Sequence, residues 1–294
     1  MENKPTKDMG SNTCFTVVTI CSIGHGDVWK HTSKLMVDFF GATKYKVYVP
    51  EKEITEFIAI TPPQFEILSQ EKLGNSYTKK LREKIVHHEN QERFGWYLQQ
   101  FHKIEAIQEV DTEGVLIWDA DCVPLKKMRF FDEAGTPLYM VASKEMHQPY
   151  FELIEKTLGI TRVQDNSFVI PGFPMRSQWV EEFIFELAGP LGKEWYGKLL
   201  DDIDFSLKSG FSETETLGTW VANRKPAGWK KTDMNWERFG QSRFGYAKSF
   251  DTKELIGIGL ANNLDIISFE NWDKRGMNRI RKYFLRKIRN AFGG

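Results

Sequence analysis

Two carboxylates that follow an apolar run are the sharpest chemical signal in the sequence. Residues 115–118 read Val-Leu-Ile-Trp, and Asp119 and Asp121 come directly after them. The run has the length of a buried strand, and open α/β sheets bind ligands beyond the carboxyl ends of their strands. Side chains two residues apart on an extended chain point to one side. Mg²⁺ and Mn²⁺ take one or two carboxylates together with substrate phosphate oxygens. The pattern therefore predicts a metal or phosphate site at Asp119 and Asp121.

The same spacing occurs a second time, at Asp202 and Asp204, where no comparable strand is expected in front. A pattern of only two aspartates arises by chance about once in a chain of this length. The preceding strand is what favours a site at the first pair, and a solvated turn at the end of a strand is the alternative for it.

A second acidic segment lies at residues 211–215, Phe-Ser-Glu-Thr-Glu. Ser212 with Glu215 three residues later matches a capping box, which begins a helix. This pattern favours a structural role for Glu215. Glu213 is not needed for the box, so the capping pattern leaves its carboxylate without an assigned role.

The elements predicted around these residues describe an α/β fold. Strands are expected over residues 14–22, 45–49, 66–69, 115–118, 138–142 and 168–170, with a last one within 256–267. Helices are expected over residues 27–40, 90–110, 178–187 and 214–222. Strands that alternate with helices imply a mostly parallel sheet flanked by helices. Residues 223–245 are rich in Trp, Lys, Arg and Gly without a clean period, and we interpret them as a functional loop.

Three stretches together resemble a known superfamily. The segment WDADCVPL (residues 118–125) resembles the D-x-D loop of nucleotide-sugar glycosyltransferases with the GT-A fold. GWYLQQFHK (residues 95–103) and FSETETLG (residues 211–218) are similar to a poorly characterised bacterial branch of that superfamily. The resemblance covers residues 13–270 and implies a Rossmann-type, GT-A-like sheet in a single domain.

The resemblance also implies a donor and a metal. The donor would be a nucleoside diphosphate sugar, whose diphosphate is bridged to Asp119 and Asp121 by Mn²⁺ or Mg²⁺. Its base and ribose would lie at the end of the first strand, where Thr19, Cys21 and Ser22 are expected, although an ordinary loop after a strand also explains these polar residues. Many metal-dependent members draw a third ligand, often His, from their C-terminal part. This chain departs from that pattern, because no histidine follows His147.

Further residues are candidates through the same resemblance. On the helix expected over residues 90–110, Tyr97, Gln100 and Lys103 could reach a sugar or a phosphate; a solvated polar face is the alternative. In inverting glycosyltransferases an acidic residue in a place comparable to Glu213 takes the proton of the acceptor hydroxyl. Glu213 is therefore the expected catalytic base, and Glu215 is the second candidate.

The implied function is transfer of a sugar to a hydroxyl of a glycan or a lipid-linked glycan. The segment at Asp119 also fits haloacid-dehalogenase-like phosphatases, in which this aspartate would be the nucleophile. About a hundred residues of α/β pattern precede it, however, and no G-D-x-x-x-D follows. A nucleotidyltransferase shares the fold and the use of metal. A glycan-binding scaffold at the membrane is the non-enzymatic alternative, and the intact Asp119, Asp121 and Glu213 argue against it.

The charge is distributed unevenly along the 294 residues. The formal net charge is zero, but residues 274–294 contain eight Lys or Arg and no Asp or Glu. The acidic body that remains argues against a nucleic-acid binder. Apolar residues interleave with the basic ones over 275–292, and this pattern predicts an amphipathic helix on an anionic membrane surface. A helix packed back on the body is the alternative.

The remaining features concern location. Residues 1–12 are polar and lack the apolar stretch of a secretory signal, and no window has the apolar length of a membrane span. The three cysteines form neither a disulfide framework nor a metal knuckle. The sequence thus predicts a polar extension over 1–12, a catalytic domain over 13–270 and a basic tail over 271–294. The expected location is cytoplasmic, peripheral to the inner face of the membrane.

Overall fold

A five-stranded sheet lies at the centre of the protein. The computed structural model describes residues 13–140, 146–190 and 194–273. The strands of the sheet are β1 (Phe15–Ile20), β2 (Lys44–Val49), β3 (Phe65–Ser69), β4 (Gly114–Trp118) and β7 (Gly172–Arg176). Their order is β3-β2-β1-β4-β7; the first four are parallel, and β7 runs antiparallel to β4. All residues of β1 and β4 are buried, which is why these strands are continuous apolar runs in the sequence.

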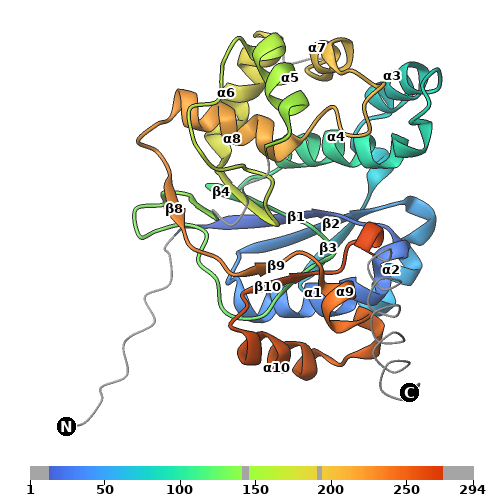
Figure 1. Cartoon of the computed structure of the whole chain (residues 1–294), viewed down its shortest axis with the longest axis vertical. Helices are drawn as coiled ribbons and strands as arrows, with labels where there is room; N and C mark the ends of the chain where they lie inside the picture. The colour runs from blue at the N-terminus through green and yellow to red at the C-terminus, as the bar shows by residue number, and fades with distance from the viewer. Residues whose placement is uncertain (1–12, 141–145, 191–193, 274–294) are drawn as a thin grey trace, which may run out of the picture.

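Helices cover both faces of this sheet (Figure 1). The α-helices are α1 (Gly26–Phe39), α2 (Ile54–Ile60), α3 (Asn75–Ile85), α4 (Phe94–Gln108), α5 (Gln148–Leu158), α6 (Ser177–Ala188), α7 (Tyr196–Asp202), α8 (Glu213–Arg224), α9 (Gly240–Phe244) and α10 (Thr252–Asn262). The 3₁₀ helices are η1 (Ile23–His25), η2 (Glu51–Glu53), η3 (Gln70–Lys72), η4 (Gln91–Arg93), η5 (Ala247–Ser249) and η6 (Asn271–Asp273). In Figure 1, α4, α6 and α8 lie above the sheet, and α1 and α10 lie below it.

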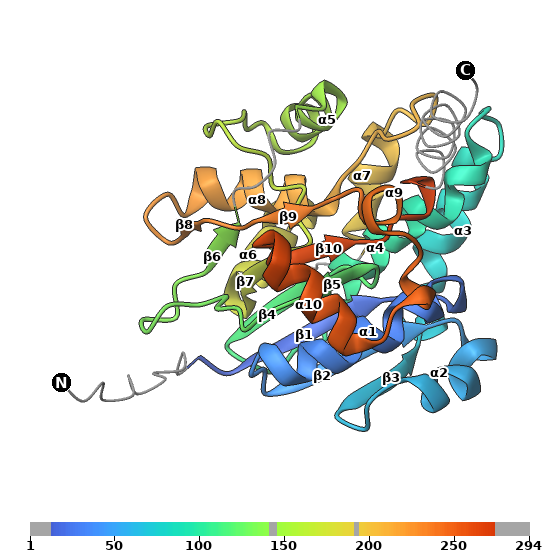
Figure 2. The same cartoon turned by 60° about the horizontal axis from the view of Figure 1, so that its bottom comes forward.

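Two small sheets complete the fold. One contains β5 (Cys122–Pro124), β10 (Ile266–Ser268) and β9 (Trp236–Glu237) in the order β5-β10-β9. The other pairs β6 (Leu138–Met140) with β8 (Lys230–Thr232). Because β5 follows Asp121 and pairs antiparallel with β10, the last described segment of the chain lies beside the D-x-D segment (Figure 2).

Aromatic packing fixes the end of β4. The Trp118 ring is fully buried and makes edge contacts with Phe40 and Phe130, at centroid distances of 4.6 and 5.9 Å. Its partner in the ladder is Gly172, where an added Cβ would lie 2.5 Å from the Trp118 ring. The Trp118 indole N–H donates to the Cys122 carbonyl at 2.8 Å and so closes the turn that contains both aspartates.

The expected α/β fold, with a mostly parallel sheet flanked by helices in one domain, is confirmed. One expected strand is wrong, and the last strand takes up only the end of its expected range. Residues 168–170 do not pair, and the Phe168 N–H donates to the Glu215 carboxylate instead. Most of residues 256–267 belong to α10, which begins with a capping box of Asp251 and Glu254; only β10 at the end of that range is a strand.

The limits of the body differ slightly from the expected ones. Asp273 is buried and accepts a hydrogen bond from the Ser242 N–H at 2.9 Å, so folded structure continues past the expected boundary at residue 270. The predicted extension over 1–12 and the predicted helix over 275–292 lie outside the described residues. Among residues 13–140, 146–190 and 194–273, none of the helices has the length and apolar character that crossing a membrane requires.

Candidate functional site

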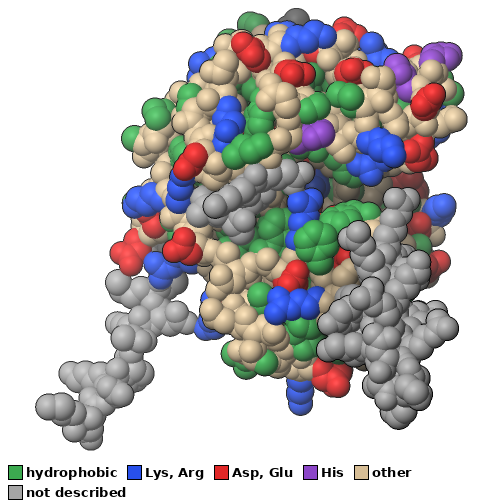
Figure 3. Space-filling model, in the orientation of Figure 1, with side chains coloured by type: hydrophobic (Ala, Val, Ile, Leu, Met, Phe, Trp, Pro, Cys, Tyr) green, Lys and Arg blue, Asp and Glu red, His purple; other side chains and the backbone are tan. Residues whose placement is uncertain are grey.

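A cleft of about 840 Å³ opens at the carboxyl ends of β1 and β4. It is lined by the residues after β1, one face of α4, the D-x-D turn, the first residues of α8 and the segment from Trp236 to Trp272. Figure 3 shows the hollowed face of the molecule, with hydrophobic and basic side chains gathered along it. The volume is within the usual range of small-molecule sites, about 300–1,000 Å³.

Backbone hydrogen bonds hold the D-x-D turn at the floor of this cleft. The Asp119 N–H donates to the Pro171 carbonyl at 3.0 Å, and the Cys122 N–H donates to the Asp119 carbonyl at 3.1 Å. Asp119 and Asp121 both line the cleft, as expected from their spacing. Burial and the nearby charge of Asp119 raise the pKa of Asp121 to about 6.

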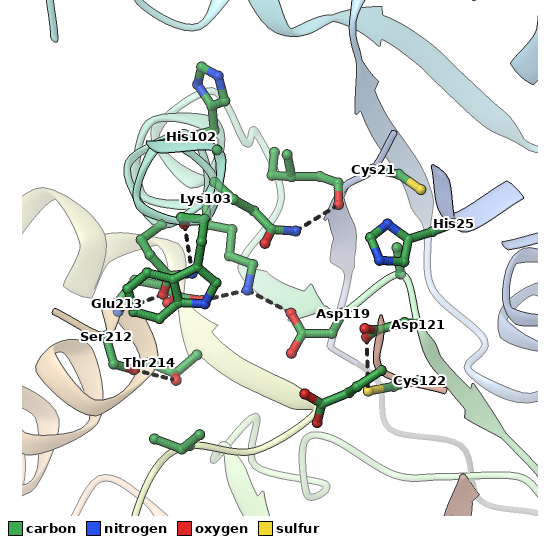
Figure 4. Close-up of a pocket in the computed structure, with 18 of the residues that line it drawn as sticks. Cys21, His25, His102, Lys103, Asp119, Asp121, Cys122, Ser212, Glu213 and Thr214 are labelled. Atoms are coloured by element: carbon green, nitrogen blue, oxygen red, sulfur yellow. Dashed lines mark hydrogen bonds and ion pairs between the residues drawn. The ribbon is translucent and has the colours of Figure 1, made fainter. Parts of the chain in front are cut away.

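Lys103 connects this turn to the other predicted carboxylate. Its side chain is only 5% exposed, and its ammonium lies 2.6 Å from Asp119 Oδ1 and 2.6 Å from Glu213 Oε1 (Figure 4). Burial by itself lowers the pKa of Lys103, but the two carboxylates outweigh it and raise the pKa above its usual value. The two carboxylates therefore favour the charged form of Lys103 between Asp119 and Glu213.

Glu213 is the first residue of α8, and its side chain is 2% exposed. Its backbone N–H donates to Gln100 Oε1 at 3.4 Å, so Gln100 helps to place the start of the helix against α4. Burial raises the pKa of Glu213, and the Lys103 ammonium partly offsets this effect. A carboxylate with a raised pKa in a cleft suits proton transfer.

Glu215 points away from the cleft. Its Oε2 accepts hydrogen bonds from the Ser167 hydroxyl at 2.6 Å and from the Phe168 N–H at 2.9 Å. Its backbone N–H donates to Ser212 Oγ at 3.3 Å, which is the Ser212 half of the expected capping box; the carboxylate that would complete the box bonds Ser167 and Phe168. Glu215 therefore ties α8 to the segment before β7, and this placement removes it from the catalytic candidates.

Two further candidates lie outside the cleft. Thr19 is fully buried within β1, which is covered on both faces, and its hydroxyl has no hydrogen-bond partner in the described part of the chain. The Tyr97 hydroxyl accepts from the Gly210 N–H at 2.8 Å and donates to the Leu207 carbonyl at 3.0 Å. Both were expected to contact the donor, and the structure gives them packing roles. Ser22 and Cys21 do line the cleft.

The sequence did not predict most of the cleft residues that come from the segment between Trp236 and Trp272. Glu270 follows β10, and the Phe269 N–H before it donates to the Asp121 carbonyl at 2.9 Å. Burial and the charge of Asp121 raise the pKa of Glu270 to about 7. Trp236 and Arg238 come from the stretch that we interpreted as a functional loop, and its lack of a period was the only signal for them.

A family model matches residues 31–216, described as a family of unknown function, DUF6492. The match covers well over half of the chain. This protein belongs to the DUF6492 family. The matched residues of this DUF6492 protein include Lys103, Asp119, Asp121 and Glu213, whereas the wall that carries Glu270 lies beyond them. The sequence has no match among curated proteins.

The acidic residues of this DUF6492 protein fit a divalent cation in part. Asp119, Asp121 and Glu270 supply the hard oxygen donors that Mg²⁺ and Mn²⁺ prefer. Burial, and after it the repulsion between these carboxylates, raises the pKa values of Asp121 and Glu270, and a bound cation would offset both effects. No three His, Cys, Asp or Glu residues within the described ranges are grouped so as to hold a metal ion. Further ligands would therefore have to come from substrate phosphate or water, as is usual for Mg²⁺.

Proposed function

We propose that this protein is a glycosyltransferase that moves a sugar from a nucleoside diphosphate donor to a hydroxyl of a glycan or a lipid-linked glycan. One observation carries the proposal: Lys103 joins Asp119 of the strand-end D-x-D to the buried Glu213 within a single cleft. Groups suited to a diphosphate and a group suited to deprotonating a hydroxyl thus face the same cavity.

Asp119 and Asp121 are the residues proposed to hold the donor diphosphate through Mn²⁺ or Mg²⁺. When bound, the cation would supply positive charge against the oxygens of the leaving diphosphate. Lys103 contributes a fixed positive charge 2.6 Å from Asp119, so the acidic floor is partly neutralised before any ligand enters. Gln100 and Ser22 also line the cleft and are available for hydrogen bonds to the donor.

Glu213 is the proposed general base of an inverting reaction. Its carboxylate would accept the proton of the acceptor hydroxyl while the hydroxyl oxygen bonds to the anomeric carbon of the donor sugar. The bond from that carbon to the diphosphate oxygen breaks, and the nucleoside diphosphate leaves with the electron pair. The hydrogen bond from Lys103 holds Oε1 of Glu213 in place during this transfer.

A thermal-shift screen of nucleotides with and without Mn²⁺ tests the proposal. Stabilisation by UDP, GDP or CDP that depends on Mn²⁺ is expected, because a ligand that binds only the native state raises the melting temperature. A response only to phosphate mimics would favour the phosphatase alternative and contradict the proposal. No response to any nucleotide would also contradict it and would favour a scaffold that binds glycan.

The basic segment over residues 275–292 is proposed to hold the enzyme on the anionic inner surface of a membrane, where a lipid-linked acceptor would be presented. Seven basic residues at about 1 kcal/mol each near a charged surface give several kcal/mol even when only some engage. Deletion of residues 275–294 should abolish salt-sensitive sedimentation with anionic vesicles and leave Mn²⁺-dependent nucleotide binding intact. Equal sedimentation of the full-length and the shortened protein would exclude this role.

A further inference from the structure

Two tryptophans with an arginine between them form the outer wall of the cleft. The Arg238 guanidinium carbon lies 5.5 Å from the centre of the Trp236 ring and 5.6 Å from that of Trp272. Trp272 is 48% exposed, and its ring lies nearly perpendicular to that of Phe239 at a centroid distance of 5.5 Å. We call Trp236, Arg238 and Trp272 the indole wall. It presents a large aromatic surface in a cleft whose floor is acidic.

The indole wall is held in place before any ligand binds. The Trp236 indole N–H donates to Ser268 Oγ at 2.7 Å, and the Trp272 indole N–H donates to the Glu270 carboxylate. Gln241 Nε2 donates to the carbonyls of Phe269 and Glu270, at 3.1 and 2.9 Å. Because both indole N–H groups are already used, the two tryptophans of the wall offer ring faces rather than donors. A rigid aromatic surface binds a flat ring with little loss of side-chain entropy.

The charged groups of the cleft form a row that ends at this wall. Glu213 and Asp119 both contact Lys103 at 2.6 Å, and Asp121 follows in the same turn. The backbone of Asp121 accepts the hydrogen bond from Phe269, which places Glu270 next, and Glu270 lies 3.3 Å from Arg238. In this series of contacts Glu213, the proposed base, comes first and the indole wall comes last.

The far end of the row is also joined to the residues after β1. Asn271 Nδ2 and His25 Nε2 lie 2.9 Å apart, so η6 and η1 meet beside the cleft. Ser22 and Gln70, at the ends of β1 and β3, line the cleft as well. Polar side chains at the edge of the parallel strands thus lie near a half-exposed indole face, a combination that suits a ligand with a flat ring and polar edges.

We propose that the indole wall binds the base of the nucleoside diphosphate, which stacks on the face of Trp272. This inference rests on the proposed function: if Glu213 takes the acceptor proton, the transferred sugar lies beside Glu213 and the diphosphate lies over Asp119 and Asp121. The nucleoside must then extend toward the opposite end of the row. Stacking on an aromatic face is tolerant of base identity, because every base has a π face. Stacking on the wall would therefore supply affinity for any base. The polar groups around Ser22 and Gln70 would determine which base binds best.

Calorimetry with Mn²⁺ present tests this inference on Trp272→Ala, using UDP, GDP, CDP and inorganic pyrophosphate as probes. The nucleotide that the wild-type protein binds best should bind at least tenfold more weakly, and pyrophosphate should bind unchanged, because it has no base to stack. Trp272→Phe should restore most of the nucleotide affinity. Trp272→Leu, which keeps apolar bulk without a π face, should not restore it and serves as the second variant if Trp272→Ala fails to fold.

Phe185→Ala is the matched control, because Phe185 is 59% exposed on α6 and does not line the cleft. Nucleotide affinity that is unchanged in both Trp272→Ala and Trp272→Leu would overturn the inference and leave the proposed function standing. An equal loss for pyrophosphate would overturn it too, because the wall would then act on the diphosphate. If the wild-type protein binds no nucleotide with Mn²⁺, the proposed function fails and this inference fails with it.

Discussion

The two Asp-x-Asp segments of this protein have the same spacing and different surroundings. Asp119 and Asp121 follow a buried strand and face a cleft, where Asp119 pairs with the buried Lys103. Asp202 ends α7 and accepts a hydrogen bond from the Thr157 hydroxyl at 2.9 Å. The second pair completes local structure, whereas the first pair faces an open cavity.

The pKa shifts in the two segments have opposite directions. Ser206 donates to Asp204 from its hydroxyl at 2.6 Å and from its N–H at 2.9 Å, and these hydrogen bonds lower the pKa of Asp204. Burial and the charge of Asp119 raise the pKa of Asp121. A carboxylate that is destabilised in the folded state is typical of a functional site, and one that is stabilised supports the fold. The meaning of a D-x-D therefore depends on the element that delivers it.

The largest expected effect is the loss of sugar transfer when Glu213, which Lys103 links to the first segment, is replaced. Glu213→Gln should lower sugar transfer by about 10²–10⁴-fold, the usual size of a general-base contribution, and leave donor binding nearly intact. Initial rates and calorimetry measure the two quantities. Glu215→Gln is the matched control and should keep its activity at temperatures where it is folded. Loss of activity in Glu215→Gln with normal activity in Glu213→Gln would show that the base has been assigned to the wrong glutamate.

A smaller effect is expected on donor affinity. Asp121→Asn should weaken Mn²⁺-dependent binding of a nucleoside diphosphate at least tenfold, because a carboxylate ligand is lost. Asp204→Asn changes the same residue type at the same position of the second segment and should not alter that affinity. Equal affinities for both variants, measured by calorimetry, would remove the metal site from this account.

The smallest expected effect is on the melting temperature at pH 7, which should rise in Asp121→Asn and fall in Asp204→Asn. Because the folded-state pKa of Asp121 is raised to about 6, its ionisation destabilises the fold as the pH rises from about 4 through 6. Without nucleotide or metal, Asp121→Asn should therefore melt above the wild-type protein at pH 7, by about 2 °C or more, and the gain should vanish near pH 4.

For Asp204 the sign is reversed. The lowered pKa means that its charge stabilises the fold above the ordinary pKa of aspartate, and this contribution is lost as the pH falls. Asp204→Asn should thus melt slightly below the wild-type protein at pH 7 and equal it in acid. Scanning calorimetry of the three proteins at both pH values provides the comparison, and shifts of the same sign would contradict the contrast between the segments.

Much of the central fold could be predicted because its strands are buried on both faces. The apolar run before Asp119 forms β4, as predicted, and the helix predicted over residues 90–110 is present as α4. The strand expected within residues 256–267 is limited to β10 at the end of that range, because the capping box of Asp251 and Glu254 starts a helix over most of it. Strand β7 was missed because it contains Pro174, which is tolerated at the edge of the sheet.

The site could be predicted only where its residues are close in sequence. Asp119 and Asp121 were predicted from their spacing after a strand and Glu213 from the resemblance of its segment to inverting glycosyltransferases, and all three line the same cleft. The contact of Lys103 with Glu213 joins residues 110 positions apart, so no local pattern encodes it. Glu270 reaches the cleft only through the pairing of β10 with β5, and such long-range pairing cannot be inferred from a single sequence.

The most direct test of the central claim is ³¹P NMR of the full-length protein incubated with Mg²⁺, a panel of nucleoside diphosphate sugars and a set of glycan acceptors, with the Glu213→Gln variant beside it. The account predicts that at least one donor yields a nucleoside diphosphate with both phosphates still on the nucleoside, and that the variant forms this product far more slowly. A nucleoside monophosphate with a sugar phosphate, free inorganic phosphate, or no turnover of any donor would contradict a glycosyltransferase.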